Sequence, residues 1–331
     1  MTIETGERQR QQQWWHARRA GEIVPVHLTH GNARATAYAA TGSADGPMLT
    51  VLGAVHGDEY EGPVAIAELL HALTTRSITG TLIAVPVVNA PAYDAGRRAS
   101  PRDDKDLARC FPGDSSGTAS EQLAHLIATE CIAPADALID LHSGGVALDG
   151  ALLVGFTATD DTAGARSREL ASAFGAPVIW EHPPPIPPGR TGSFALDRGI
   201  PFIYTEATGG GQADRTTVTC FVEGVQRVMV AMGMLPGDAP APRHRDYWRG
   251  GGNTDTMVAA RIDGLFRASA RAGDVVTAGT PVGEIIDAHG TVIERLLAPH
   301  AGVLPFIRRI PRVRPGDGLY MLTQRVEEAL P

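Results

Sequence analysis

The end of one apolar segment constrains this chain more than any other feature. The run from Met48 to Val55 predicts a buried strand, and it ends at His56. After a glycine, the pattern from Val64 to Leu73 predicts a helix, with Pro63 in the first turn, where proline is favoured. In an open α/β sheet, sites form where strands end. We therefore expect His56 and Glu59 to project together from the end of a strand.

An imidazole and a carboxylate three residues apart can chelate one divalent metal ion. A third ligand has to come from another segment, and His142 is the best candidate because it also follows an apolar run, Ala137–Leu141, and precedes glycines. Two histidines and one glutamate leave a coordination position open on zinc for water or substrate. The pattern predicts a catalytic rather than a structural metal site.

A third strand end supplies a further carboxylate. Residues 200–206 form an apolar run that ends at Glu206 and is followed by a glycine run, Gly209–Gly211. A carboxylate that binds no metal but lies beside a metal-activated water has the properties of a general base. We expect Glu206 to take that role.

Taken together, these segments resemble the succinylglutamate desuccinylase/aspartoacylase family, which is related to zinc carboxypeptidases. The resemblance covers roughly residues 25 to 325, and its motifs occur in the order of the family. The matching motifs are Gly53–Glu59, Arg98–Pro101, Asp106–Gly113, Asp140–Gly144 and Tyr204–Glu206.

The resemblance implies roles for individual residues. It implies one zinc ion per chain, held by His56, Glu59 and His142. It implies that Glu206 is the general base and that Arg98 lies near the scissile carbonyl or the developing oxyanion. The implied activity is hydrolysis of the amide bond of a small N-acylated amino acid or related amine.

Within the family, the stretch Gly57–Pro63 is most similar to N-acetyl-diaminobutyrate deacetylases. One motif departs from the family pattern. The family has Asn-Arg before its Phe-Pro-Gly, where the pair helps to hold the substrate carboxylate, and this chain has Ala108 and Arg109. Alanine offers no side-chain hydrogen bond, whereas Arg109 can bind a carboxylate bidentately. Either Arg109 suffices, or the substrate lacks that carboxylate or places it differently.

Two further residues are candidates for substrate binding. Arg190 follows a proline-rich segment, residues 183–188, that precedes the Glu206 strand by few residues and is expected to rim the pocket. A plain surface role for Arg190 is an equal alternative. Tyr204 lies two residues before Glu206 and joins the candidates.

Strands and helices alternate through residues 1–238, which predicts a catalytic domain with a polar N-terminal extension over residues 1–20. The resemblance implies an α/β fold with a zinc-carboxypeptidase-like mixed, mainly parallel sheet flanked by helices. Pro240, Pro242 and the run Gly250–Gly252 predict a linker. Short strands separated by turns then predict a C-terminal β domain over residues 239–331.

Two stretches of that domain, Ala272–Ile285 and Ala298–Val303, resemble the β-barrel of the biotinyl/lipoyl hammerhead. Carriers of that type have a lysine in a tight hairpin, but the corresponding turn, Asp287–Gly290, has none. We therefore expect the barrel to cap the catalytic pocket or to form a subunit contact. The turn histidines His289 and His300 are expected to be exposed.

Two other functions remain open. A metallocarboxypeptidase would trim the C-terminal residue of a peptide, although a capping β domain and Ala108 argue against an open cleft that captures a terminal carboxylate. A non-catalytic metal-dependent binding protein or carrier would keep the site as a relic, although the missing lysine and the intact set of candidate ligands argue against it. Cleavage of whole peptides would support the first, and ligand retention without turnover would support the second.

Composition narrows the partners. The formal net charge is −8 and the basic clusters are short, so the chain is not expected to bind nucleic acid. It has no run of about eighteen apolar residues, so no membrane span is expected. The N-terminus has no apolar core typical of a secretory signal, and we expect a cytoplasmic protein. Trp14 and Trp15 in the polar extension suggest packing on another subunit, and hence a homo-oligomer, or on their own domain.

Overall fold

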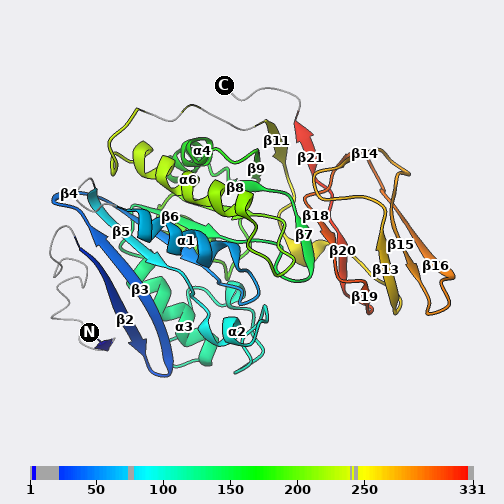
Figure 1. Cartoon of the computed structure of the whole chain (residues 1–331), viewed down its shortest axis with the longest axis horizontal. Helices are drawn as coiled ribbons and strands as arrows, with labels where there is room; N and C mark the ends of the chain where they lie inside the picture. Colours follow the sequence, from blue (N-terminus) through cyan, green and yellow to red (C-terminus); the bar gives the residue numbers. More distant parts are fainter. Residues whose placement is uncertain (1, 5–21, 74–77, 239–240, 242–244, 327–331) are drawn as a thin grey trace.

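The computed structural model describes residues 2–4, 22–73, 78–238, 241 and 245–326. Its largest feature is a twisted mixed sheet (Figure 1). In spatial order the strands are β1 (Thr2–Glu4), β2 (Ile23–His30), β3 (Ala33–Thr41), β5 (Thr79–Val85), β4 (Ala44–Gly53), β6 (Ala137–Leu141), β10 (Phe202–Glu206), β8 (Leu153–Thr157), β9 (Val178–His182), β11 (Asp246–Arg249) and β21 (Gln324–Val326). The predicted mixed α/β fold is confirmed.

Most neighbouring strands of this sheet run parallel. The central pairs β5–β4, β4–β6 and β6–β10 are parallel, as are β8–β9 and β9–β11. Antiparallel pairs occur at β2–β3, β3–β5, β10–β8 and β11–β21. Because β4, β6 and β10 are adjacent and parallel, their carboxyl ends meet at one edge. This edge carries the residues that follow Gly53, Leu141 and Thr205.

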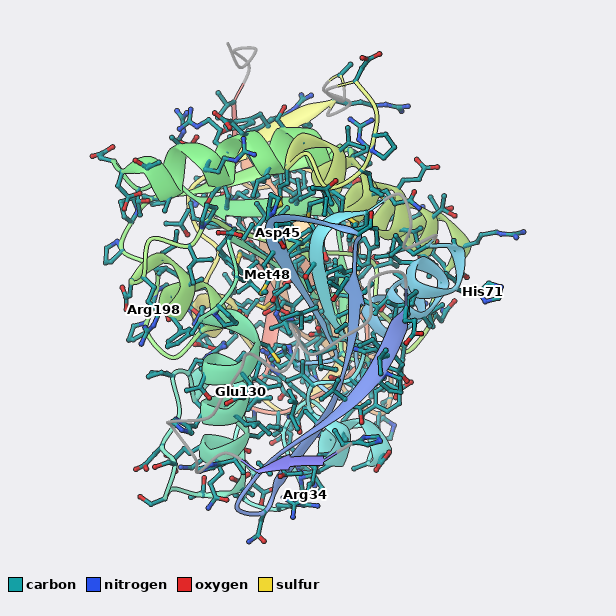
Figure 2. All side chains as sticks on the ribbon, turned by 90° about the vertical axis from the view of Figure 1, so that its left-hand side faces the viewer. Arg34, Asp45, Met48, His71, Glu130 and Arg198 are labelled. Carbon is teal, nitrogen blue, oxygen red and sulfur yellow. The ribbon has the colours of Figure 1, made fainter. Side chains whose placement is uncertain are left out.

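Helices cover both faces of the sheet. They are α1 (Glu61–Ala72), α2 (Ala90–Asp94), α3 (Ala119–Ile127, continued by a π-helical turn over Ala128–Ile132), α4 (Thr162–Phe174), α5 (Thr191–Leu196) and α6 (Arg215–Ala231). Helix α6 packs on α1 and α4 on one face, and α3 packs against β2 and β3 on the other. Figure 2 views the sheet along its plane, with His71 of α1 and Glu130 beyond α3 on opposite sides. Buried apolar side chains fill both interfaces.

The C-terminal part forms smaller antiparallel sheets. Their strands are β12 (Val258–Ala259), β13 (Gly264–Ala268), β14 (Val275–Val276), β15 (Pro281–Ile286), β16 (Val292–Leu297), β17 (Gly302–Val303), β18 (Phe306–Arg308), β19 (Arg312–Val313) and β20 (Gly318–Tyr320). They enclose their own apolar core and lie at the end of the molecule remote from β2 (Figure 1). His289 and His300 are exposed, as expected. The hammerhead topology stays a prediction.

The C-terminal part is joined to the large sheet more closely than a linker would allow. Strand β11 lies within the predicted linker, where it pairs in parallel with β9, and β21 then pairs with β11. Strand β7 (Leu148–Gly150) leaves the catalytic region and pairs with β18. The proposed boundary at residue 238 is therefore crossed by sheet hydrogen bonds.

The segment that carries Arg98 and Arg109 is partly helical. Residues 90–117 contain α2 and a short 3-10 helix, Leu107–Arg109, which are capped by Asn89 and Asp106 respectively. Trp14 and Trp15 lie outside the described residues. In the part of the chain that the structure describes, no helix is both long and apolar enough to cross a membrane.

Candidate metal centre

The three predicted metal ligands meet at the carboxyl edge of the sheet. His56 and Glu59 follow β4, and His142 follows the adjacent parallel strand β6. His56 Nδ1 lies 2.7 Å from Glu59 Oε1, and His142 Nδ1 lies 2.9 Å from Glu59 Oε2. One nitrogen or oxygen atom from each of the three lies within 4.8 Å of the others, a group that could hold a metal ion.

Local backbone geometry brings these side chains inward. Ala54, just after β4, adopts a φ of +47°, a left-handed conformation that is uncommon without a glycine and that turns the chain sharply. Gly62 in the first turn of α1 lies against β6, because an added Cβ would come within 2.8 Å of the Leu141 carbonyl oxygen. This close approach of helix to strand places Glu59 beside His142.

A second carboxylate orients each histidine. His56 Nε2 lies 3.1 Å from Asp106 Oδ1, and His142 Nε2 lies 3.0 Å from Asp140 Oδ2. Each ring therefore turns Nε2 to a carboxylate and Nδ1 to Glu59. Metal-binding histidines usually donate their other N–H to such a partner, which leaves the ligating nitrogen free of a proton. The donor set and these outer partners fit a divalent metal centre.

Electrostatics keep the central glutamate ionised. Burial alone would raise the pKa of Glu59, but the His56 and His142 rings outweigh that effect and lower it well below its usual range. Glu59 is almost completely buried. A buried carboxylate that stays charged is suited to bind a cation.

Glu206, at the end of β10, lines the same cavity as the three candidate ligands. Its Oε2 is buried and has no hydrogen-bond partner among the described residues. Burial, and then the nearby charge of Glu59, raise the pKa of Glu206 well above its ordinary value. A carboxylate without a partner and with a raised pKa is a strong proton acceptor, and groups of this kind concentrate at functional sites.

The cavity has a volume of about 340 Å³. Besides the groups already named, its apolar lining includes the proline-rich segment 183–187, Phe202, and Phe306 from the C-terminal part. Residues 251–254, which follow β11, also line it. The C-terminal part therefore contributes to the wall of the cavity, and its expected role as a cap or a subunit contact stays a prediction.

The three predicted arginines all line this cavity, but their partners differ. Arg98 Nε lies 3.1 Å from Asp106 Oδ2, and Arg98 Nη1 lies 3.7 Å from Glu59 Oε1. Arg98 is therefore next to the candidate metal ligands. This position suits a cation that stabilises negative charge on a bound carbonyl.

Arg109 and Arg190 lie on the side of the cavity formed with residues 253–255. Arg109 donates to Asp255 through Nε (3.1 Å) and Nη2 (2.8 Å), so the carboxylate fork expected for a substrate is taken by a protein carboxylate. Arg190 Nη2 donates to Asn253 Oδ1 at 2.8 Å and lies 4.0 Å from Asp255. Desolvation, and then the charge of Arg109, lower the pKa of Arg190.

Tyr204 lies on the same face of β10 as Glu206. Its hydroxyl lies 2.6 Å from Nε2 of His182, a buried residue at the end of β9. Burial lowers the pKa of His182 to about 4, so the ring is neutral near neutral pH. Burial also raises the pKa of Tyr204 well above its ordinary value.

Sequence analysis missed Asn253, Asp255 and His182. Asp255 is 146 residues from Arg109 in sequence and lies in a short 3-10 helix, Thr254–Thr256. No local pattern connects these positions. The glycine run before Asn253 was the one available signal, since three successive glycines permit a close backbone approach.

With this geometry in view, the chain can be compared with known proteins. The family model of the succinylglutamate desuccinylase/aspartoacylase catalytic domain matches residues 45–232, which contain every candidate metal ligand and Glu206. The chain therefore belongs to the succinylglutamate desuccinylase/aspartoacylase family.

Individual relatives refine that placement. The chain is 31% identical over 293 residues to the N-alpha-acetyl-L-2,4-diaminobutyric acid deacetylase of Halomonas elongata, covering 86% of this chain and 84% of that protein. The product-bound ectoine utilization protein EutE (DoeB) of Ruegeria pomeroyi superposes with a TM-score of 0.83 at 27% identity, covering 93% and 96% of the two chains. A succinylglutamate desuccinylase/aspartoacylase from Rhodobacter sphaeroides gives a TM-score of 0.82 at 28% identity, covering 93% and 97%.

Proposed function

We propose that this protein is a zinc-dependent deacylase that hydrolyses the amide bond of a small N-acylated amino acid or a related amine. One observation carries the proposal: Glu206, whose buried Oε2 has no hydrogen-bond partner among the described residues, lines the same small cavity as a His-Glu-His group. Membership of the family and the deacetylase from Halomonas elongata support it.

In this proposal His56, Glu59 and His142 hold the metal. Two nitrogen donors and one carboxylate suit zinc better than they suit magnesium or calcium. When bound, zinc would supply a Lewis acid that polarises a carbonyl and makes water more acidic. Asp106 and Asp140 keep the two imidazoles in the orientation that directs Nδ1 to the ion.

The remaining chemistry belongs to residues of the chain. Glu206 takes the proton of the attacking water, which its raised pKa favours, and returns it to the leaving nitrogen. Arg98 stabilises the negative charge that develops on the carbonyl oxygen. Glu59 and His56 are almost inaccessible to solvent, and charges interact more strongly in such a buried environment than in water, which strengthens both effects.

The arginines suggest where a substrate carboxylate binds. Arg109 is neutralised by Asp255, whereas the nearest partner of Arg190 is the uncharged amide of Asn253. A half-buried guanidinium with a neutral partner retains affinity for an anion. We therefore assign the substrate carboxylate to Arg190. In this assignment Arg190 takes over the binding role of the family asparagine that Ala108 replaces, and the substrate can still carry a carboxylate.

The test is amide hydrolysis by the purified protein, reconstituted with zinc and compared with a chelated control. The panel pairs N-acyl amino acids, including N-acetyl-diaminobutyrate, with matched amides that lack the α-carboxylate. We expect chelator-sensitive cleavage of the amino acid set. Cleavage confined to the carboxylate-free set would contradict the assignment of Arg190. No cleavage of either set, with zinc bound, would overturn the proposed activity.

A further inference from the structure

The groups around His182 determine whether the Tyr204 hydroxyl donates or accepts its hydrogen bond to that ring. His182 lies between the Tyr204 hydroxyl, 2.6 Å from Nε2, and the carbonyl oxygen of Gly251, 3.1 Å from Nδ1. A carbonyl oxygen can only accept a hydrogen bond, so Nδ1 must carry the proton. In a neutral imidazole the other nitrogen is then an acceptor. Tyr204 must therefore donate its proton to Nε2.

The neutral state of His182 is consistent with its surroundings. The ring is buried, and burial lowers its pKa to about 4. Among charged groups, Glu181 favours protonation and Arg190 opposes it. The rings of Trp180 and Tyr204 flank it at centroid distances of 4.6 and 5.7 Å, and neither supplies a formal charge.

The glycine run Gly250–Gly252 fixes this arrangement. All three residues have positive φ angles of 92°, 60° and 100°, which glycine adopts without strain. The Gly250 carbonyl accepts from Trp180 Nε1 at 2.6 Å while the Gly251 carbonyl faces His182, two residues further along β9. A Cβ added to Gly252 would collide with the His182 ring. The Gly250–Gly252 run thus packs closely against the side chains of Trp180 and His182 on β9.

Tyr204 itself has little freedom to move. A Cβ on Gly155 of the neighbouring strand β8 would collide with its ring, so the phenol fills space that only a glycine leaves. Its ring also stacks on Phe202, with centroids 6.1 Å apart and planes at 13°. Both rings line the catalytic cavity. A ligand in the cavity that contacts the phenol oxygen would therefore meet a lone pair and not the proton, which is held by His182.

We propose that Tyr204, held as a pure hydrogen-bond acceptor by His182 and the Gly250–Gly252 run, binds the N–H of the scissile amide and so selects secondary amides over esters. This inference rests on the proposed deacylase function and deepens it. Tyr204 contacts the substrate, whereas His182 and the glycine run act through Tyr204 as positioning residues.

The place of the acceptor on β10 favours the scissile nitrogen. Residues two apart on a strand point to the same face, about 7 Å apart. Glu206 must reach the leaving nitrogen to protonate it, and Tyr204 lines the same cavity from the same face of β10, so we assign its acceptor to the N–H of that nitrogen. An acceptor there binds the N–H and leaves the nitrogen lone pair directed to Glu206. An ester has oxygen at that position and can offer only lone pairs, which an acceptor repels.

The decisive experiment compares Tyr204→Phe with the zinc-loaded wild type on an N-acetyl amine and on the matched O-acetyl ester. Loss of one hydrogen bond to substrate is expected to lower kcat/KM for the amide by about 10- to 100-fold. The ester rate should not fall, because an ester has no N–H for Tyr204 to bind and the substitution removes only a repulsion between two oxygen atoms. Equal losses on amide and ester would overturn the proposal, since a structural role would affect both.

Gly252→Ala tests the positioning role from a residue of the cavity wall whose added Cβ would be directed at the His182 ring. Its Cβ displaces His182, so we expect the amide-to-ester ratio to fall as it does in Tyr204→Phe, with unchanged zinc content. An unchanged ratio would contradict a role for the glycine run.

A nitrogen NMR measurement separates this inference from the proposed activity. In the wild type, His182 should show a protonated Nδ1 and an unprotonated Nε2 at neutral pH, and the assignment is made by comparison with His182→Gln. Protonation at Nε2 would overturn the proposal even if the enzyme hydrolyses amides. If the expected tautomer is found but the protein cleaves no amide, the proposed function is wrong while the hydrogen-bond arrangement of Tyr204 and His182 stands.

Discussion

The wall of the cavity that carries the candidate metal ligands and the wall that carries Arg109 and Arg190 are built in different ways. The first uses residues that directly follow β4 and β6, held by strand pairing and by the packing of α1. The second uses side-chain contacts between distant segments, such as Arg109 with Asp255 and Arg190 with Asn253. Asp255 is 56% exposed at its side chain, whereas Glu59 is 2% exposed.

This difference separates the two properties of the site. In the proposed function, the first wall and Glu206 supply the charges and the proton acceptor for amide hydrolysis. The wall formed with residues 251–255 is proposed to select the substrate, because its side-chain contacts can change without disturbing the sheet. Substitutions in the first wall should therefore affect turnover, and substitutions in the second should affect affinity and selectivity.

The largest effect is expected from Glu206→Gln. The amide keeps the shape of the side chain but cannot accept the proton, and loss of a general base costs about 10²- to 10⁴-fold in rate. We expect kcat to fall by about 10³-fold while bound zinc, measured by elemental analysis, stays equal to the wild type. A variant with near-normal kcat would remove Glu206 from the mechanism, and loss of zinc would move it to the metal-binding set.

A pH-dependent loss of stability is expected from His182. The folded state holds the ring neutral to about pH 4, whereas the unfolded ring takes up a proton near pH 6.5. The stability that neutral His182 contributes is present above pH 6.5 and is lost as the pH falls toward 4, by about 3 kcal/mol. Below pH 4 this contribution changes no further.

Chemical denaturation of wild type and His182→Phe over pH 4–7.5 measures this loss. The variant lacks the titrating group. The free energy of unfolding of the wild type, measured relative to that of the variant, should therefore be lower by about 3 kcal/mol at pH 4 than at pH 7.5. A difference that does not vary with pH would show that His182 titrates alike in both states.

Arg190→Gln should act on substrate affinity. Removing a charge that binds a carboxylate is expected to raise KM for N-acyl amino acids by about 10-fold or more, with kcat changed little. Matched amides without the carboxylate serve as the internal control and should be unaffected. If their KM rises equally, Arg190 supports the pocket wall through Asn253 instead of binding substrate.

The smallest effect is expected from Asp255→Asn. The pair with Arg109 lowers the pKa of Asp255, but the carboxylate is exposed, and exposed pairs contribute about 1 kcal/mol or less. Releasing Arg109 should lower KM for anionic substrates by a few-fold at most. A higher KM, measured on the same panel, would mean that Asp255 instead holds Arg109 in a substrate-binding position.

Sequence reasoning succeeded where a single segment carries the information. The strand patterns ending at His56, His142 and Glu206 indicated adjacent strand ends, and the structure brings all three side chains to one cavity. Asp255 and Asn253 could not be found in this way, because their partners are set by the three-dimensional path of the chain after β11. The same limit explains why β11 was taken for a linker, since its four residues are stabilised by β9 and β21 and not by a local pattern.

The pairing of β11 and β21 at the edge of the large sheet has a consequence for protein engineering. The C-terminal part leaves the sheet after one of these strands and returns to it through the other, so both of its ends are hydrogen-bonded to the same edge. A movement of this part away from the sheet would therefore have to bend or separate both paired strands. A chimaera that takes the pocket wall from a relative should therefore keep β11 and β21, residues 246–249 and 324–326, and exchange only the segment between them.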